Sequence, residues 1–204
     1  MKHKENTSPE WSNNLTIYEV NLRQYTPQGT LRAFREHLPR LKSLGVGILW
    51  FMPIQPIGTV NRKGTLGSYY SVQDYYGINP DFGTLDEFRS LVDEIHELDM
   101  YVILDWVANH TAWDNPMSSE HPEWYTKNDE GNFQPPPGTN WDDVIDLDYS
   151  NDELRTNMTA AMEYWVREVG IDGFRCDVAG MVPTDFWESV TPALQKIKPV
   201  FMLA

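Results

Sequence analysis

Short hydrophobic runs alternate with amphipathic stretches along the chain, a pattern typical of alternating strands and helices. The run Val102-Ile103-Leu104 lacks polar alternation, as expected of a parallel strand that is covered on both faces. On this pattern we predict five strands, at Leu15–Val20, Val46–Phe51, Tyr101–Trp106, Gly173–Val178 and Pro199–Leu203.

The first two predicted helices have clear boundary signals. Apolar residues recur at helical spacing after Thr30, and Gly45 can close that helix. Pro39 interrupts the stretch, so we expect either a kink or two short helices. The run Thr84-Leu85-Asp86-Glu87 has the capping-box pattern and opens a helix that continues to about Leu98.

Two more helices are predicted in the second half of the chain. One begins at Ser150 or Asn151, presents an apolar face and ends before Gly170. The other is expected to have Thr184 as its N-cap and to continue to about Lys196.

Strand spacing indicates the fold class. The shortest intervals between predicted strands, about 26 and 31 residues, suit one strand–helix unit of an eight-fold barrel. Two longer intervals contain insertions, at Ile54–Phe82 and from His110 to about Tyr149, and both begin at the C-terminal end of a strand. We therefore expect an α/β fold, an incomplete (β/α)8 TIM barrel of about five strands and four helices.

The expected domain organisation follows from these insertions. We predict an N-terminal extension, the first part of the barrel, a short inserted domain after the third strand, and a continued but truncated barrel, at residues 1–14, 15–109, 110–149 and 150–204 respectively.

Composition narrows the function classes. The 204 residues include a single Cys and no Cys/His cluster, which excludes an intramolecular disulfide framework and the usual structural zinc sites. With 16 Lys and Arg against 30 Asp and Glu, the net charge of −14 argues against nucleic acid or an anionic membrane as a partner. Aromatic residues make up 13%. Such rings stabilise a core or provide flat faces that stack on sugars or bases, and the count does not decide between these roles.

Targeting signals are absent from the sequence. No apolar run is long enough to span a bilayer, and the basic N-terminus is not followed by a hydrophobic stretch. If Met1 is the true start, we expect a cytoplasmic protein. A removed signal peptide would leave the same sequence, so secretion stays open, as does the oligomeric state.

Polar residues gather where the predicted strands end. Arg175 and Asp177 lie two apart on one side of a strand, where the Arg favours an ionised Asp that can act as a nucleophile. A structural ion pair is the alternative. His110 follows Asp105 and Asn109 closely at the suspected mouth of the barrel and is either a donor to a substrate hydroxyl or an ordinary loop histidine.

Several segments together resemble the α-amylase family of glycoside hydrolases. The resemblance is strongest at DWVANH and GFRCDVA, which are similar to two signatures of that family, and it extends from about Leu15 through nearly the whole chain. The matching segments are IYEVNLRQYT (17–26), WFMPIQPIG (50–58), SYYSVQDYYGINPDFGT (68–84), DWVANH (105–110), DVIDLD (143–148) and GFRCDVA (173–179).

The resemblance implies retaining cleavage of α-glucosidic bonds in an α-glucan or maltooligosaccharide, as part of carbohydrate metabolism. Asp177 matches the catalytic nucleophile, and Arg175 matches the arginine that orients it. Tyr70 and His110 match residues at the sugar ring being cleaved, by stacking and by hydrogen bonding respectively. Asp105 matches a supporting carboxylate beneath the site.

A structural calcium ion is the cofactor that the resemblance implies. Asn109 and Asp146 match calcium-binding positions of many members, although two side chains supply fewer than the usual 6–8 oxygen ligands. One departure concerns the same ion. Many calcium-dependent members have Lys-His shortly after the nucleophile, whereas this sequence has Gly180-Met181. In those members the His binds the ion through its backbone carbonyl, which any residue can supply. The Lys binds sugar through its side chain, so its absence puts a starch-type sugar subsite in doubt.

The larger departure is at the fifth predicted strand. The family places its acid/base Glu at the end of that strand, and Pro199–Ala204 resembles the strand up to the residue before it. The later His-Asp signature has no match in 1–204 either. Since such an acid typically contributes about 10²–10⁴-fold to the rate, we expect the 204-residue chain to be inactive alone.

Two other function classes stay open. A sugar-binding, non-catalytic module would fit the missing acid but has no need of the Arg175–Asp177 pair. A structural or interaction role, as in amylase-like subunits of membrane complexes, fits the intact nucleophile signature less well. Within the enzyme class, transglycosylation, isomerisation and exo-glucosidase action are alternatives to hydrolysis.

Overall fold

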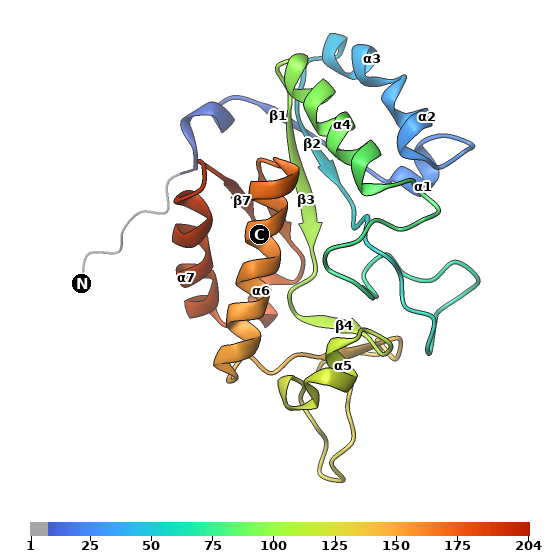
Figure 1. The fold of residues 1–204 in the computed structure, drawn as a ribbon, viewed down its shortest axis with the longest axis vertical. Helices are drawn as coiled ribbons and strands as arrows, with labels where there is room; N and C mark the ends of the chain where they lie inside the picture. Colours follow the sequence, from blue (N-terminus) through green and yellow to red (C-terminus); the bar gives the residue numbers. More distant parts are fainter. Residues whose placement is uncertain (1–7) are drawn as a thin grey trace.

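The computed structural model describes residues 8–204. Its main sheet has five parallel strands, and helices pack along it (Figure 1). The strands lie in the order β1-β2-β3-β6-β7. Their bounds are Thr16–Val20, Val46–Phe51, Tyr101–Trp106, Gly173–Cys176 and Phe201–Leu203. The five predicted strands are therefore present, and each pairs in parallel with the next along the chain, as consecutive units of a barrel do.

Strand β3 lies at the centre of the sheet. Val102, Ile103 and Leu104 are fully buried, because strands flank β3 on both sides and α4 (Leu85–Glu97) packs against it. This explains the uninterrupted apolar run in the sequence.

The stretch around Pro39 forms two helices, α2 (Leu31–Arg35) and α3 (Leu38–Ser43). Pro39 lies in the first turn of α3, where its missing N–H costs no helical hydrogen bond. Of the two expectations for this stretch, two short helices is confirmed.

Helix α4 begins as predicted. The Thr84 hydroxyl accepts a hydrogen bond from the Glu87 amide at 3.2 Å, and the Glu87 carboxylate accepts one from the Thr84 amide at 2.8 Å. Two amides that the helix itself cannot satisfy are thereby bonded, which fixes where the helix starts.

Helix α6 (Asp152–Tyr164) is capped by Asn151, whose side chain accepts from the amides of Glu153 and Leu154. It continues as a π-helical turn, Trp165–Val169, and ends at Gly170, which has the left-handed φ of 86°. Only glycine adopts that conformation without strain, so the chain turns here towards β6.

Several predicted boundaries are wrong. Strand β7 begins at Phe201, two residues after the predicted Pro199, and β1 begins at Thr16, one residue after the predicted Leu15. Helix α7 (Thr184–Gln195) is preceded by Pro183 as its N-cap residue, and Thr184 is its first helical residue rather than the cap. Strand β6 ends at Cys176, two residues before the predicted Val178, because Val178 has a left-handed φ of 41°. That dihedral cannot continue a strand.

The inserted segment contains short elements that the sequence pattern did not predict. β4 (His110–Ala112) and β5 (Val144–Asp146) form an antiparallel pair, with α5 (Met117–Glu120) between them. Another unpredicted helix, α1 (Leu22–Tyr25), follows β1.

Residues 1–7 of the expected N-terminal extension lie outside the described residues. Within the remainder of the extension, the indole of Trp11 stacks on Tyr101 with ring centroids 4.0 Å apart and donates to the Pro199 carbonyl at 3.3 Å. The extension thus packs against the start of β3 and against the residues that lead into β7.

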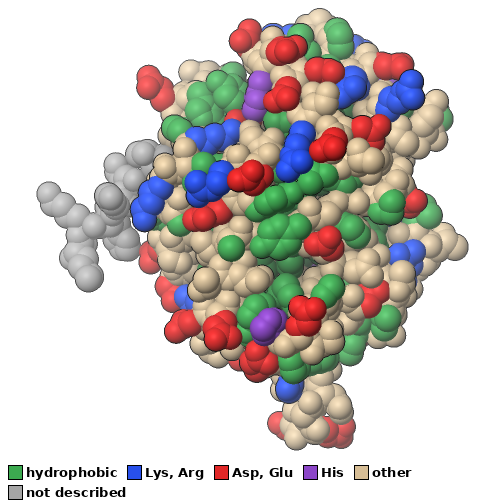
Figure 2. Space-filling view, viewed as in Figure 1, with side chains coloured by type: hydrophobic (Ala, Val, Ile, Leu, Met, Phe, Trp, Pro, Cys, Tyr) green, Lys and Arg blue, Asp and Glu red, His purple; other side chains and the backbone are tan. Residues whose placement is uncertain are grey.

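The surface carries acidic and basic side chains intermixed. Figure 2 shows Asp and Glu distributed between Lys and Arg over the face that it draws, without a broad basic area. Within residues 8–204, no helix combines the length and apolar character needed to cross a membrane.

Candidate active site

A pocket of about 400 Å³ opens where strands β2, β3 and β6 end. Its walls come from the two insertions and from the residues directly after β6. The lining residues are Lys63, Ser68, Tyr70, His110, Trp141, Asp143, Val144, Asp177 and Val178. Three of the predicted site residues, Tyr70, His110 and Asp177, therefore line one cavity at the carboxyl ends of the parallel strands, where barrel sites lie.

Arg175 joins two carboxylates beneath this pocket. One of its nitrogens, Nη1, lies 2.8 Å from Asp177 Oδ1 and 3.0 Å and 3.1 Å from the two oxygens of Asp105. Asp105 and Arg175 are paired residues of β3 and β6, so the sheet register places them opposite each other. The Asp105 side chain is fully buried.

Burial and the shared guanidinium act in opposite directions on these carboxyl groups. Desolvation raises the pKa of Asp105 to about 7, although Arg175 lowers it. The pKa of Asp177 is also raised by burial, and again Arg175 opposes the shift. Arg175 thus favours the ionised form of Asp177, as the sequence analysis expects, but burial is the larger effect.

The sequence analysis missed Trp50 as a member of this cluster. Its indole donates to Asp105 Oδ2 at 3.2 Å, and the Arg175 guanidinium lies 5.1 Å from its ring centroid. Tyr70 also donates to Asp105 Oδ2, at 3.4 Å. The sequence did contain a signal for Trp50. It is the penultimate residue of β2, just as Asp105 is the penultimate residue of β3.

His110 is buried at the wall of the pocket, and its imidazole is neutral at physiological pH. Burial lowers its pKa to about 4, although the nearby Asp143 carboxylate opposes the shift. Its Nδ1 lies 3.2 Å from the Asn109 side-chain nitrogen. The Tyr70 backbone is a further hydrogen-bonding partner of the ring. When the Asn109 amide donates to Nδ1, the ring proton is on Nε2.

Asn109 directly precedes β4, and Asp146 is the last residue of β5, the strand that pairs with β4. Asp146 pairs with His110 in the strand register, and the Leu147 amide donates to the Asn109 carbonyl at 3.1 Å. Asp146 is buried and accepts from the Thr126 hydroxyl at 2.9 Å, and burial raises its pKa. Asp146 forms no ion pair with any of the described residues. The side chains of Asn109 and Asp146 would supply an amide oxygen and a carboxylate, both of which are ligand types that calcium binds.

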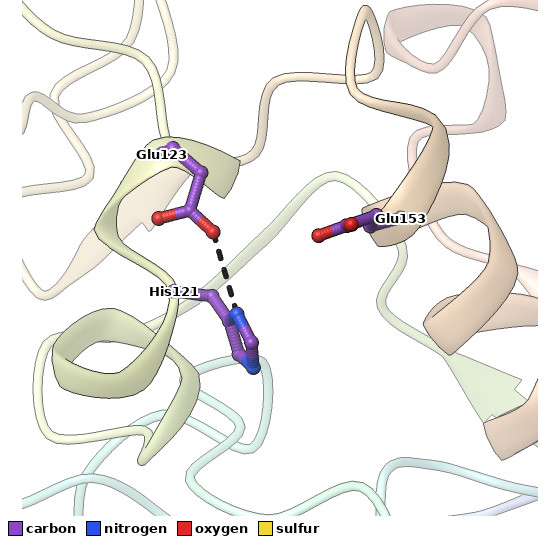
Figure 3. Close-up of side chains that lie close together, drawn as sticks. All are labelled: His121, Glu123 and Glu153. Atoms are coloured by element: carbon purple, nitrogen blue, oxygen red, sulfur yellow. Dashed lines mark hydrogen bonds and ion pairs between the residues drawn. The ribbon is translucent and has the colours of Figure 1, made fainter.

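A different cluster brings together the described residues His121, Glu123 and Glu153, where the inserted segment meets the start of α6 (Figure 3). The His121 ring nitrogen Nδ1 lies 3.3 Å from the Glu123 carboxylate. Both side chains are exposed, at 41% and 54%, so a surface hydrogen bond accounts for their approach.

The other pocket residues, among them Lys63 and Trp141, were not predicted as site residues. Both belong to the insertions that the sequence analysis places at the mouth of the barrel. The sequence thus predicted that the insertions lie near the site, but not that these two side chains line the pocket.

Known proteins resemble this chain over most of its length. A family model described as "Alpha amylase, catalytic domain" matches residues 5–145 and 139–197. The chain belongs to the alpha-amylase family. It is 31% identical to Alpha-amylase 3 of Dictyoglomus thermophilum over 93% of this chain and 42% of that protein.

Solved structures of the alpha-amylase family confirm the partial barrel. An alpha-amylase from Lactobacillus plantarum superposes with a TM-score of 0.89 at 45% identity, over 93% of this chain and 44% of the other. The maltogenic alpha-amylase AmyB from Thermotoga neapolitana gives a TM-score of 0.88 at 44% identity, over 94% and 46%. This alpha-amylase-family chain thus spans less than half the length of these relatives.

Proposed function

We propose that this chain takes part in retaining cleavage of α-glucosidic bonds, with Asp177 as the nucleophile. The observation that carries the proposal is that Asp177 lines the pocket while its Oδ1 lies 2.8 Å from Arg175 Nη1. In the reaction, a carboxylate oxygen of Asp177 bonds to the anomeric carbon as the bond to the leaving oxygen breaks. Water then cleaves the glycosyl ester.

The surrounding residues are proposed to orient the sugar. The protonated Nε2 of His110 donates to a hydroxyl, and the Tyr70 ring packs against the sugar. Asp105 accepts from Tyr70 and Trp50 and holds Arg175 in place, so its role is to position the groups that touch the substrate.

Substrates are proposed to be α-glucans and maltooligosaccharides. The names of the relatives, an alpha-amylase and a maltogenic alpha-amylase, support this class. The pocket supports it as well, since it combines aromatic faces at Tyr70 and Trp141 with hydrogen-bonding groups.

A retaining glycosidase also needs a proton donor about 5–5.5 Å from the nucleophile. The second carboxylate in the pocket wall is Asp143, and it already forms an ion pair with Lys63 at 3.1 Å. We therefore propose that the 204-residue chain alone cleaves unactivated α-glucosides far more slowly than a relative of full length.

An α-glucosyl fluoride separates the nucleophile from the proton donor, because fluoride leaves without being protonated. We expect the wild-type chain to gain the mass of one glucosyl unit on Asp177. The ester should persist, because the other carboxylate among the described residues that line the pocket, Asp143, is paired with Lys63 and is a poor general base for water. Intact-protein and peptide mass spectrometry measure the adduct.

Asp177→Asn should abolish the adduct, since an amide is a poor nucleophile. Asp185→Asn is the matched control, because Asp185 is also paired with an arginine, Arg155, but lies on the surface. An unmodified wild-type chain, or an adduct on another residue, would overturn the proposal. Maltose binding without an adduct would instead favour the sugar-binding module.

We also propose a structural calcium ion held by the side-chain oxygens of Asn109 and Asp146, together with backbone carbonyls and water. The buried Asp146 carboxylate supports it, because a bound cation would favour its ionised form. Such an ion would fasten the inserted segment to the end of β3.

A further inference from the structure

One wall of the pocket is built from two insertions that are far apart in the sequence. Lys63 belongs to the insertion after β2, and its ammonium donates to the Asn140 carbonyl at 2.9 Å. The same nitrogen lies 3.1 Å from Asp143 Oδ1, whose side chain is only 6% exposed. Lys63 thus bonds to the first and last residues of the segment 140–143, which includes Trp141.

Trp141 is the aromatic residue of this segment that lines the pocket. Its ring centroid lies 5.4 Å from that of His110, with the planes at 59°. The side chain is half-buried, so part of the indole is accessible to a ligand. The indole therefore offers an apolar face beside the residue that we place at the first sugar ring.

Further contacts fix the backbone around Trp141. The Ser71 hydroxyl donates to the Asp143 carbonyl at 3.0 Å, and the Trp113 indole donates to the Asp142 carbonyl at 2.9 Å. Lys63 differs from these anchors because it supplies charge. Without its ammonium, the buried Asp143 carboxylate loses its cation, which drives the segment to rearrange towards water.

We propose that Lys63 is a positioning residue that holds Trp141 as a stacking face for a second sugar ring, so that the site prefers two-ring α-glucosides over a single glucoside. This deepens the proposed function, on which it rests for the location of the first ring. The C–H face of a pyranose buries apolar area against an indole, which supplies the preference.

The residues proposed at the first ring do not bond to Lys63 directly. Tyr70, His110 and Asp177 form no hydrogen bond or ion pair with it among the described residues. Loss of Lys63 is therefore expected to weaken binding of the second ring more than binding of the first ring, which the segment touches only where Trp141 packs beside His110.

Titration calorimetry with maltose and with methyl α-glucoside tests the proposal on the 204-residue chain. We expect the wild type to bind maltose about tenfold more tightly. Trp141→Ala and Lys63→Met should reduce that ratio to near one, with a smaller loss of affinity for methyl α-glucoside than for maltose. The split between the two ligands is a readout that a general structural loss would not produce.

Lys42→Met is the matched control, since Lys42 also donates to a backbone carbonyl, that of Asp99, at 3.1 Å. It should leave the ratio unchanged. Two results would overturn the proposal: equal affinities of the wild type for the two ligands, or a preserved ratio in either variant, whether the two affinities stay the same or fall together. The fluoride experiment tests Asp177 separately, so a failure of the nucleophile and a failure of the second-ring site give different results.

Discussion

At the scale of single residues, one nitrogen of Arg175 bonds to two carboxylates, those of Asp105 and Asp177. Burial raises the pKa of both carboxyl groups, and the positive charge of Arg175 opposes this shift. Removing that nitrogen leaves Asp105 and Asp177 facing each other without a cation. Broken buried pairs of this kind cost about 3–5 kcal/mol.

We therefore expect Arg175→Leu to lower the free energy of unfolding by about 3–5 kcal/mol at pH 8, as measured by urea denaturation. The loss should shrink at pH 5, because Asp105 can then take up a proton in place of its lost partner. The double variant Arg175→Leu/Asp105→Asn should recover part of the stability at pH 8. Equal losses in the single and double variants would contradict this account.

His110 predicts a pH dependence of a different origin. Its pKa is lowered from 6.5 to about 4 by burial, so between these values the unfolded chain binds more protons than the native one. The stability from the neutral imidazole is full above pH 6.5 and is lost as the pH falls through about 4.

His110→Gln should remove this slope, so that the stability gap between wild type and variant narrows as the pH falls from 7 to 4.5. Denaturant unfolding at a series of pH values measures the gap. Asp105 has a raised pKa and contributes the opposite slope in both proteins, so the difference between them isolates His110. A gap that stays constant with pH would argue against the buried, neutral histidine.

At the scale of elements, local signals predicted those elements that local interactions define. The capping box at Thr84 and Glu87 fixed the start of α4, and the apolar run of β3 identified a strand covered on both faces. Strands β4 and β5 have only three residues each, and their pairing joins His110 to Asp146, so no local pattern could reveal them. The start of α7 was misplaced because Thr184 looks like a cap, whereas Pro183 occupies that position.

The β4–β5 pair is also the element that the proposed calcium ion would hold. We expect calcium to raise the melting temperature of the chain and a chelator to reverse the rise, because a ligand of the native state stabilises it. Asp146→Asn should weaken this response, while Asp114→Asn, a carboxylate of the same segment bonded to Thr59, should preserve it. Scanning calorimetry with and without calcium measures the effect, and an identical response in Asp146→Asn would exclude the site.

At the scale of the whole molecule, the barrel and the residues beneath the site were predictable, but the walls of the pocket were not. Asp105, Arg175 and Asp177 follow or end strands, and parallel strands bring their carboxyl ends to one edge. Trp50, Lys63 and Trp141 contact the site through long-range packing of side chains and insertions, which spacing along the chain does not encode. The family itself was recognisable because its motifs occur in order over nearly the entire sequence.

The pairing of Asp105 with Arg175 has a consequence for synthesis on the ribosome. The two residues are 70 positions apart, so β3 emerges with its acidic group long before the partner that compensates it. Chains emerge at roughly 5–20 residues per second, which leaves Asp105 without its cation for several seconds. Nascent structure that buried Asp105 during this interval would favour its protonated form, because desolvation raises the pKa of a carboxyl group. Arg175 then emerges only two residues ahead of Asp177, so the second carboxylate never waits for its counterion.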